Sequence, residues 1–335
     1  MKLKCAVAGL GTNGRMHFAQ LKAMQNVEIV AVSDQRIDEI AGDVNIADIP
    51  HKFTAYEELI AFGDFEAIFI FTPSGQHIDH ITKAAKAGKH IFCEKPLGKD
   101  ESIEECQRTL DFVNEQNIKL QIGFNRRFDP QFKEIHDRVR DGAIGTPQIV
   151  KVVARDPFVL PYDFIINSGG LIQDFTAHDF DMVRYQAGSD IEEIYLQGSV
   201  LIDPKLAEMN DLDTLTASCR LANGGLALID ESREAVYGYD QRVEVFGDKG
   251  MLKAENVSES TVEYYSDTDV SMKKPLDYYL NRFKAAYIYE KECFVDSVLN
   301  DKPVICKGED ALIAMKCCIA AQKSYATGKP VKVEY

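Results

Sequence analysis

Short apolar runs alternate with amphipathic, helix-like segments over the first third of the chain. The runs that we interpret as strands cover residues 3–8, 28–34, 67–71, 90–93 and 118–122. The spacing of the apolar residues between them predicts helices, for example over 15–24, 78–87 and 103–115. Uninterrupted apolar runs are typical of strands that are buried on both faces of a sheet. This part of the chain therefore predicts a parallel sheet with helices on both faces.

The pattern changes shortly after the last of these runs. Beyond a predicted helix over 131–140, apolar and polar residues alternate, as they do in an antiparallel sheet with one solvated face. The alternating segments cover residues 148–154, 193–200, 214–221, 226–232 and 242–246. A helical spacing returns over 285–299 and 309–325. The second part of the chain therefore predicts an α+β domain with a large, mostly antiparallel sheet and closing helices.

Glycines at positions 9, 11 and 14 follow the first strand-like run and match the pattern G-x-G-x-x-G. One glycine permits the tight turn, the second lets the backbone approach a pyrophosphate, and the third allows close helix–strand packing. Asp34 ends the second run about 20 positions later, where a carboxylate accepts hydrogen bonds from an adenosine ribose. A solvated Asp34 at a strand end is the alternative.

The predicted fold class is thus α/β, with two domains. An N-terminal Rossmann domain over residues 1–123 binds the dinucleotide, and the α+β domain over 124–335 serves substrate binding and oligomerisation. The pattern leaves open whether the closing C-terminal helices pack back on the first domain.

Charge and composition argue against several classes of partner. The 335 residues carry a formal net charge of −15, which disfavours nucleic acids and anionic membranes as partners. The longest apolar runs are too short to span a bilayer, and the N-terminus does not resemble a signal peptide. The eight cysteines are scattered without a metal-type spacing, as is typical of a reducing compartment. We therefore expect a cytoplasmic protein with no nucleic-acid or membrane partner.

Lys95 is the first candidate for a catalytic side chain. It lies between Glu94 and Pro96 at the end of a predicted strand, and the proline restricts Lys95 to an extended backbone conformation. The alternative is a surface lysine without a chemical role, and the isomer of the Lys95–Pro96 bond stays open.

A second candidate group follows two glycines at 169 and 170. Asp174 and His178 are four residues apart, so on a helix they share one face with their Cβ atoms about 5–6 Å apart. One alternative is a hydrogen-bonded pair that braces the helix. Another is a metal site of His178 with Asp174 and Asp181, which would lack a second histidine nearby.

Taken together, these motifs resemble the Gfo/Idh/MocA family, which includes glucose–fructose oxidoreductase and inositol dehydrogenase. The family features are G-x-G-x-x-G at 9–14, Thr72-Pro73 with His77, Glu94-Lys95-Pro96, Gly169-Gly170 before Asp174 and His178, and the endings 308–310 and 327–330. Segments 121–129, 178–182 and 237–247 are similar to the myo-inositol 2-dehydrogenase branch. The resemblance covers essentially the whole chain.

The resemblance implies an NAD(P)-dependent oxidoreductase that acts on the CH–OH group of a cyclitol or sugar, with oxidation of myo-inositol to 2-keto-myo-inositol as first choice. His178 would take the hydroxyl proton, Lys95 would donate a hydrogen bond to the same oxygen, and Asp174 would orient the substrate. These three residues are the implied catalytic set. A homotetramer or homodimer is implied, and a metal is not.

The resemblance also implies which residues contact the two ligands. The cofactor would contact Gly9, Gly11, Thr12, Asn13, Gly14, Asp34, Arg36, Thr72, Pro73, His77, Glu94 and Lys95. The substrate would contact Arg126, Arg127, Asn167, Asp174, His178, Tyr237 and Tyr239. NAD is the expected cofactor because Asp34 would repel a 2′-phosphate, although Arg36 leaves NADP open.

Three alternatives remain at this point. The first is that the substrate is another polyol or sugar, such as scyllo-inositol, glucose or xylose, because residues 158–167 resemble the inositol branch less than their surroundings do. The second is that Arg127 and Tyr237 have structural roles and do not contact the substrate. The third is that the protein is a non-catalytic NAD(P)-sensing regulator, although such a sensor has no chemical need for Lys95, Asp174 and His178.

Overall fold

A computed structural model describes residues 2–40, 46–99 and 102–335, and these residues form two compact units. The first unit runs to Asn125 and also includes Tyr287–Ile313. The second consists of Arg126–Ala286 and Ala314–Tyr335. The division thus falls close to the predicted boundary between residues 123 and 124, and one late segment returns to the first unit.

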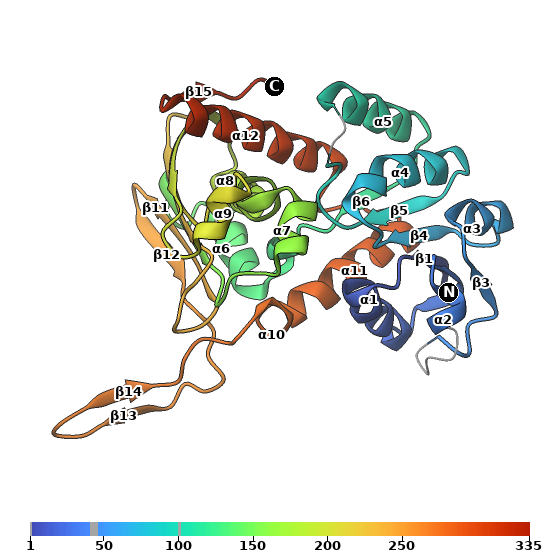
Figure 1. Cartoon of the computed structure of the whole chain (residues 1–335), viewed down its shortest axis with the longest axis horizontal. Coiled ribbons are helices and arrows are strands. Elements are labelled where there is room, and N and C mark those ends of the chain that lie inside the picture. Colours follow the sequence, from blue (N-terminus) through green and yellow to red (C-terminus); the bar gives the residue numbers. More distant parts are fainter. Residues whose placement is uncertain (1, 41–45, 100–101) are drawn as a thin grey trace. The chain divides into compact units, whose positions relative to one another are not determined.

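The first unit contains a parallel sheet with the strand order β3-β2-β1-β4-β5-β6 (Figure 1). The strands are β1 (Leu3–Ala8), β2 (Val27–Ser33), β3 (His51–Phe53), β4 (Ala67–Ile70), β5 (His90–Cys93) and β6 (Leu120–Ile122). This order is that of the doubly wound dinucleotide-binding fold, in which ligands bind outside the carboxyl ends of the strands. The predicted Rossmann domain is therefore confirmed.

Helices connect these strands. They are α1 (Thr12–Ala23), α2 (Ile37–Ile40), α3 (Tyr56–Phe62), η1 (Ser74–Gln76), α4 (His77–Lys86) and α5 (Ile103–Glu115). The Ser102 side chain caps α5, because it accepts a hydrogen bond from the Glu105 N–H at 3.1 Å. Ala55 is the N-cap of α3, and its own N–H donates to Glu58 Oε2 at 3.4 Å.

Helix α11 (Lys284–Leu299) belongs to the first unit from Tyr287 onward. Its Phe294 is fully buried, with its ring centroid 5.3 Å from that of Phe69 on β4 and 5.9 Å from that of Phe92 on β5. Burying a side chain of this size stabilises the fold by about 1.5–3 kcal/mol. Aromatic packing on the parallel sheet therefore explains why a segment so late in the sequence joins the first unit.

The second unit is built on a sheet with the strand order β12-β11-β7-β10-β9-β8-β15. The strands are β7 (Pro147–Arg155), β8 (Ile191–Ser199), β9 (Thr214–Leu221), β10 (Leu226–Ser232), β11 (Asp240–Gly247), β12 (Gly250–Ala254) and β15 (Val331–Lys332). Neighbouring strands are antiparallel, except that β7 and β10 pair in parallel. The predicted mostly antiparallel sheet is confirmed.

The remaining elements of this unit surround or extend the sheet. They are η2 (Asn125–Phe128, in this unit from Arg126 on), α6 (Pro130–Arg140), α7 (Tyr162–Ser168), the π-helix η3 (Leu171–Thr176), α8 (Ala177–Ala187), α9 (Pro204–Glu208), α10 (Tyr279–Arg282), α12 (Gly308–Thr327, in this unit from Ala314 on), and strands β13 (Glu263–Tyr265) and β14 (Val270–Met272). The β13–β14 hairpin extends away from the rest of its unit (Figure 1). Within the described ranges, no helix is both long and apolar enough to cross a membrane.

Candidate functional site

The glycine-rich turn between β1 and α1 contains glycines that meet two different requirements. A Cβ on Gly9, whose φ is +90°, would lie 2.6 Å from the carbonyl carbon of Phe71, and a Cβ on Gly14 would collide with the carbonyl oxygen of Gly9. The packing of the protein itself therefore requires both residues to be glycine. A Cβ on Gly11 would have nothing within 4 Å. The space beside Gly11 suits the close approach of a pyrophosphate.

The first turn of α1 also suits an anion. In the described helix α1, the N-cap Gly11 supplies no side-chain cap and the first turn, beginning with Thr12 and Asn13, carries no acidic residue. The backbone N–H groups at a helix N-terminus and the positive end of its dipole favour phosphate. The turn therefore fits the dinucleotide that the glycine pattern predicts.

Substitution of the glycines tests this difference directly. Gly11→Ala is expected to fold normally, because Gly11 has φ −64° and ψ −169° and its Cβ position is open, but to bind NAD about 10-fold or more weakly. Gly14→Ala is expected to lower the melting temperature itself. Differential scanning fluorimetry with and without NAD separates the loss of NAD binding from the loss of stability. An unchanged NAD affinity of Gly11→Ala would contradict the placement of the pyrophosphate beside Gly11.

Asp34 follows β2 and lies against the glycine-rich turn. Its Oδ2 accepts a hydrogen bond from the Leu10 N–H at 2.7 Å, and its Oδ1 accepts one from the Arg36 N–H at 2.9 Å. A carboxylate has about four acceptor positions, so these bonds orient the group and leave capacity for a ribose diol. The Arg36 side chain is 60% exposed, with Nε 3.8 Å from Asp34 Oδ1.

His77 joins two loops at the carboxyl ends of β4 and β5. Its Nε2 lies 2.9 Å from the carbonyl oxygen of Thr72, and its Nδ1 lies 2.6 Å from that of Pro96. The residue is only 1% exposed. The structure therefore places His77 as a brace between the Thr72-Pro73 loop and the loop of Lys95, in the position expected for the predicted cofactor edge.

Lys95 lies directly beyond β5, and its peptide bond to Pro96 is cis, the isomer that the sequence left open. The Lys95 N–H donates to Glu94 Oε2 at 3.3 Å. A Cβ on Gly123 would lie 2.9 Å from Glu94 Oε1, so the absence of a side chain there makes room for the Glu94 carboxylate. Glu94 is largely buried, and its Oε1 lies 3.0 Å from Nε2 of His17 in the same unit.

In the second unit, the helix predicted to carry both Asp174 and His178 is not continuous α-helix. Asp174 lies in the π-helix η3, and His178 lies in the first turn of α8. Asp211 accepts a hydrogen bond from the Leu171 N–H at 2.8 Å at the start of η3. A Cβ on Gly170 would lie 2.5 Å from that Asp211 oxygen, which explains the glycine. π-helical turns of this kind occur frequently at functional sites.

Two buried ion pairs surround this segment. Arg126 pairs with Asp179, and Arg127 donates to both oxygens of Asp181, from Nε at 2.8 Å and from Nη2 at 2.6 Å. All four side chains are at most 6% exposed. Hydrogen bonds between a guanidinium group and a carboxylate are strong because both partners are charged, so these pairs hold α8 in place. Both arginines are predicted substrate contacts, and the structure pairs them with carboxylates on α8.

Three residues near this segment were missed by the sequence reasoning. Asp156 and Arg233 immediately follow β7 and β10, whose parallel pairing puts Arg155 opposite Ser232. The Arg233 guanidinium is fully buried and lies 3.9 Å from Asp156 and 3.7 Å from Asp211. Residues that follow parallel strands share one edge of the sheet, but the parallel pairing itself was not predictable.

The negative charge of Asp174 contributes to the electrostatics of Asp156. Burial raises the pKa of Asp156 to about 7, although the positive charge of Arg233 opposes this, and the negative charge of Asp174 raises it further. Asp174 itself is 9% exposed. The second unit thus gathers carboxyl and guanidinium groups around η3, an arrangement able to hydrogen-bond the hydroxyl groups of a polar substrate.

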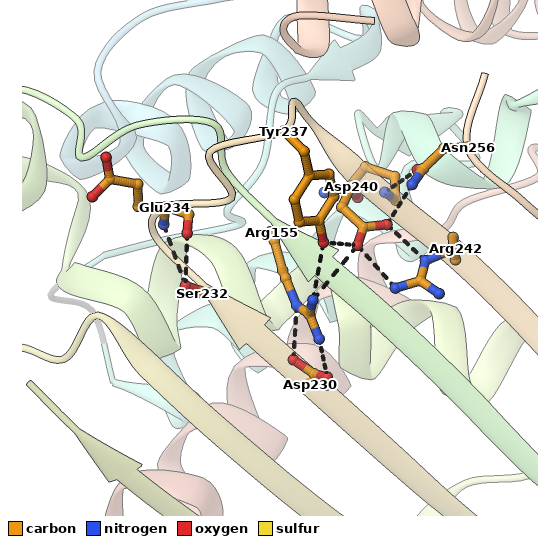
Figure 2. A network of polar contacts seen from close by, with 9 residues as sticks. Arg155, Asp230, Ser232, Glu234, Tyr237, Asp240, Arg242 and Asn256 are labelled. Carbon is orange, nitrogen blue, oxygen red and sulfur yellow. Dashed lines mark hydrogen bonds and ion pairs between the residues drawn. The ribbon is translucent and has the colours of Figure 1, made fainter. Parts of the chain in front are cut away.

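The two predicted tyrosines lie in different surroundings. Tyr239 is 4% exposed, and burial raises its pKa. The Tyr237 hydroxyl donates to Asp240 at 2.5 Å and accepts from Arg155 at 3.0 Å. Figure 2 shows this network, in which Arg155 also pairs with Asp230. Tyr237 therefore has the structural contacts that the alternative interpretation predicted.

Asn167 is exposed near the end of α7, where its side-chain amide donates to the carbonyl oxygen of Asp163 at 2.8 Å. Of the predicted substrate contacts, the structure thus brings Asp174 and His178 into adjacent helical segments. It places Arg126 and Arg127 in ion pairs with the second of these segments.

Comparison with known proteins agrees with this geometry. Residues 3–124 match the model of an oxidoreductase family with an NAD-binding Rossmann fold, and residues 132–253 match the Gfo/Idh/MocA C-terminal domain. The chain is 40% identical over 329 residues to the uncharacterized oxidoreductase YrbE of Bacillus subtilis, covering 98% of this chain and 96% of that protein.

Two further relatives have assigned activities. The chain is 36% identical over 332 residues to a myo-inositol 2-dehydrogenase of Thermotoga maritima, covering 99% of each protein. It superimposes with a TM-score of 0.91 on the crystal structure of scyllo-inositol dehydrogenase from Lactobacillus casei with bound NAD(H) and scyllo-inositol, at 29% identity over 99% of each chain.

Proposed function

The chain belongs to the Gfo/Idh/MocA family of oxidoreductases, and we propose that it is an inositol 2-dehydrogenase that uses NAD. It oxidises a ring CH–OH group of myo-inositol to the ketone. The main support is the similarity, over nearly the whole chain, to inositol dehydrogenases, together with the presence of Lys95, Asp174 and His178.

In this proposal the first unit holds the dinucleotide. The backbone at residues 9–14 binds the pyrophosphate at the N-terminus of α1, and Asp34 accepts hydrogen bonds from the adenosine ribose. The loops after β4 and β5 carry the other predicted cofactor contacts, from Thr72 and Pro73 to Glu94 and Lys95. When bound, NAD supplies the nicotinamide carbon that accepts a hydride.

The chain's own residues manage the proton and the charge on oxygen. His178 accepts the hydroxyl proton as the C–H bond breaks and the C=O bond forms, because a neutral imidazole is a suitable base near neutral pH. Lys95 donates a hydrogen bond to the same oxygen and stabilises its developing negative charge. Asp174 accepts hydrogen bonds from substrate hydroxyls. Arg126 and Arg127 hold α8 through their ion pairs and so position His178.

The direct test is spectrophotometric. Purified protein is mixed with NAD or NADP and a panel of myo-inositol, scyllo-inositol, glucose and xylose, and the absorbance of the reduced nicotinamide is followed. Fastest reduction of NAD with myo-inositol is expected. Greater activity with scyllo-inositol, the substrate bound by the Lactobacillus casei relative, would assign that isomer instead. Measurable NAD binding without reduction by any compound would refute the enzyme and favour the sensor.

Cofactor preference provides a second prediction. Asp34→Ala is expected to weaken NAD binding about 10-fold or more and to narrow the preference for NAD over NADP, because the carboxylate both binds the ribose diol and repels a 2′-phosphate. Titration of each cofactor by fluorescence measures both effects. An Asp34→Ala protein with the NAD affinity of the wild type would contradict the ribose contact.

We also propose that the protein is a homo-oligomer, as a tetramer or a dimer. The side chains of Met251, Phe246 and Leu226 are each at least 43% exposed, and they occupy adjacent strands in one row that also includes Ile149. An apolar row on the open face of a sheet is typical of an interface. Light scattering of the purified protein measures the mass.

The scattered cysteines support a cytoplasmic location.

A further inference from the structure

A buried cluster of ionisable side chains lies beside the Glu94-Lys95-Pro96 turn, entirely within the first unit. It consists of His17 on α1, Glu94 after β5, and Glu290 and Lys291 on α11. His17 is 1% exposed, and Glu290 and Lys291 are fully buried. The reaction proposed above gives no role to His17, Glu290 or Lys291.

The contacts in the cluster form a chain that ends at Lys95. Lys291 Nζ lies 2.9 Å from His17 Nδ1, and it also donates to the carbonyl oxygen of Tyr287. His17 Nε2 lies 3.0 Å from Glu94 Oε1. The other oxygen of Glu94 accepts the Lys95 N–H at 3.3 Å.

These contacts define the tautomer of His17. A protonated lysine only donates, so His17 Nδ1 is the acceptor, and the ring proton resides on Nε2, the nitrogen that lies 3.0 Å from Glu94 Oε1. Burial, together with the positive charge of Lys291, lowers the pKa of His17 to about 4, which keeps the ring neutral at working pH. The ring also stacks on Phe71, with a centroid distance of 4.2 Å and an interplanar angle of 8°, so it has little freedom to turn.

The cluster sets two acidic side chains and a histidine around one lysine. The ligand atoms of His17, Glu94 and Glu290 lie within 4.8 Å of one another, close enough to hold a cation, and Lys291 Nζ lies 3.5 Å from Glu290 Oε1. Burial raises the pKa of Glu290, against the opposing effect of Lys291, and so favours its protonated form. Burial lowers the pKa of Lys291, while the carboxyl groups of Glu290 and Glu94 raise it, so the lysine is held by both acids.

We propose that His17 and Lys291 are positioning residues for Lys95: they hold the Glu94 carboxylate, and the carboxylate holds the backbone and the amine of Lys95 in place. This inference rests on the catalytic role of Lys95 in the proposed function. Burial raises the pKa of Glu94, but the contact with His17 and then the positive charge of Lys95 lower it, so the pKa stays below its usual value and the carboxylate attracts Lys95. A catalytic group misplaced by about 1 Å costs about 10²-fold in rate.

The test uses the full-length protein with matched variants. His17→Ala removes the link without removing a charge, and His17→Gln retains an acceptor for Lys291 and a donor for Glu94. Lys291→Met removes the buried cation. The controls are His90→Ala, at the far end of β5, and Lys302→Met, whose side chain is 59% exposed and pairs at the surface with Asp296. Each protein is compared by thermal melting and by NAD affinity.

Two further readouts decide the proposal. The first is kcat, which is expected to fall about 10- to 100-fold in His17→Ala and Lys291→Met, to recover in His17→Gln, and to stay unchanged in the controls. The second is the rate at which an amine-reactive reagent labels Lys95, followed by mass spectrometry. A several-fold change is expected in His17→Ala and Lys291→Met alone. Should Lys291→Met not fold, His17→Ala and His17→Gln carry the comparison.

The possible outcomes separate the two proposals. If folded His17→Ala matches the His90→Ala control in kcat or in the labelling of Lys95, the positioning role is refuted. If the wild type oxidises no compound of the panel, the proposed function fails. In that case the labelling rates still decide whether the cluster positions Lys95.

Discussion

Replacing Lys95 by alanine is expected to lower kcat for inositol oxidation by about 10²–10³-fold while NAD affinity changes little. The loss follows from removing a charged donor that stabilises the oxygen as negative charge develops on it. NAD binding should survive, because the pyrophosphate and ribose contacts arise from residues 9–14 and Asp34. Stopped-flow absorbance of the reduced nicotinamide gives kcat, and fluorescence titration gives the affinity.

A matched control distinguishes this effect from a general loss of positive charge. Lys86→Ala removes an exposed lysine at the end of α4 in the same unit and should leave kcat unchanged. A Lys95→Ala protein with the kcat of Lys86→Ala would rule out the catalytic role. A large fall in NAD affinity without a fall in kcat would move Lys95 from the reaction to cofactor binding.

Replacing His178 by alanine is expected to lower kcat by about 10²–10⁴-fold, the usual contribution of a positioned general base. The pH dependence should change as well. In the wild type, kcat/KM is expected to fall at acidic pH as the base becomes protonated. In His178→Ala that ionisation should be absent, and the residual rate should rise with hydroxide concentration. Initial rates between about pH 5 and 10 measure both quantities.

His136→Ala is the control for this variant. His136 lies in the same unit, stacks on Tyr185 at 3.7 Å, and has its Nδ1 2.8 Å from the Tyr185 carbonyl oxygen, so its loss should affect stability alone. Retention of the acidic limb of the pH profile in His178→Ala would show that another group acts as the base.

Residues whose role depends on neighbours in the sequence were predictable. The glycines at 9, 11 and 14, the strand before them and the helix after them form one local pattern, and β1 has the predicted bounds. The same is true of β9 and β10, where the alternation of apolar and polar residues matches the observed burial. The family motifs likewise led to the oxidoreductase fold and to NAD.

Other features depend on contacts between distant segments, which local patterns do not encode. The parallel pairing of β7 with β10 brings Asp156 and Arg233 to one edge of the sheet, and no repeat or motif marks either residue. The π-helix η3, which contains Asp174, is another example. The sequence predicts only a helix there, and Asp211, which accepts the hydrogen bond from the Leu171 N–H at its start, lies 40 positions from Leu171.

By itself, then, the sequence determined the parallel nucleotide-binding fold, the antiparallel sheet and the candidate residues Lys95, Asp174 and His178, because periodicity and short motifs are local. Only the tertiary structure decided what holds Glu94 beside Lys95. His17 and Lys291 are 274 positions apart, yet they meet because α11 returns to the first unit to bury Phe294. Buried polar atoms have lost their hydrogen bonds to water and must find partners within the protein. The Glu94 carboxylate is one of the partners that His17 and Lys291 find here.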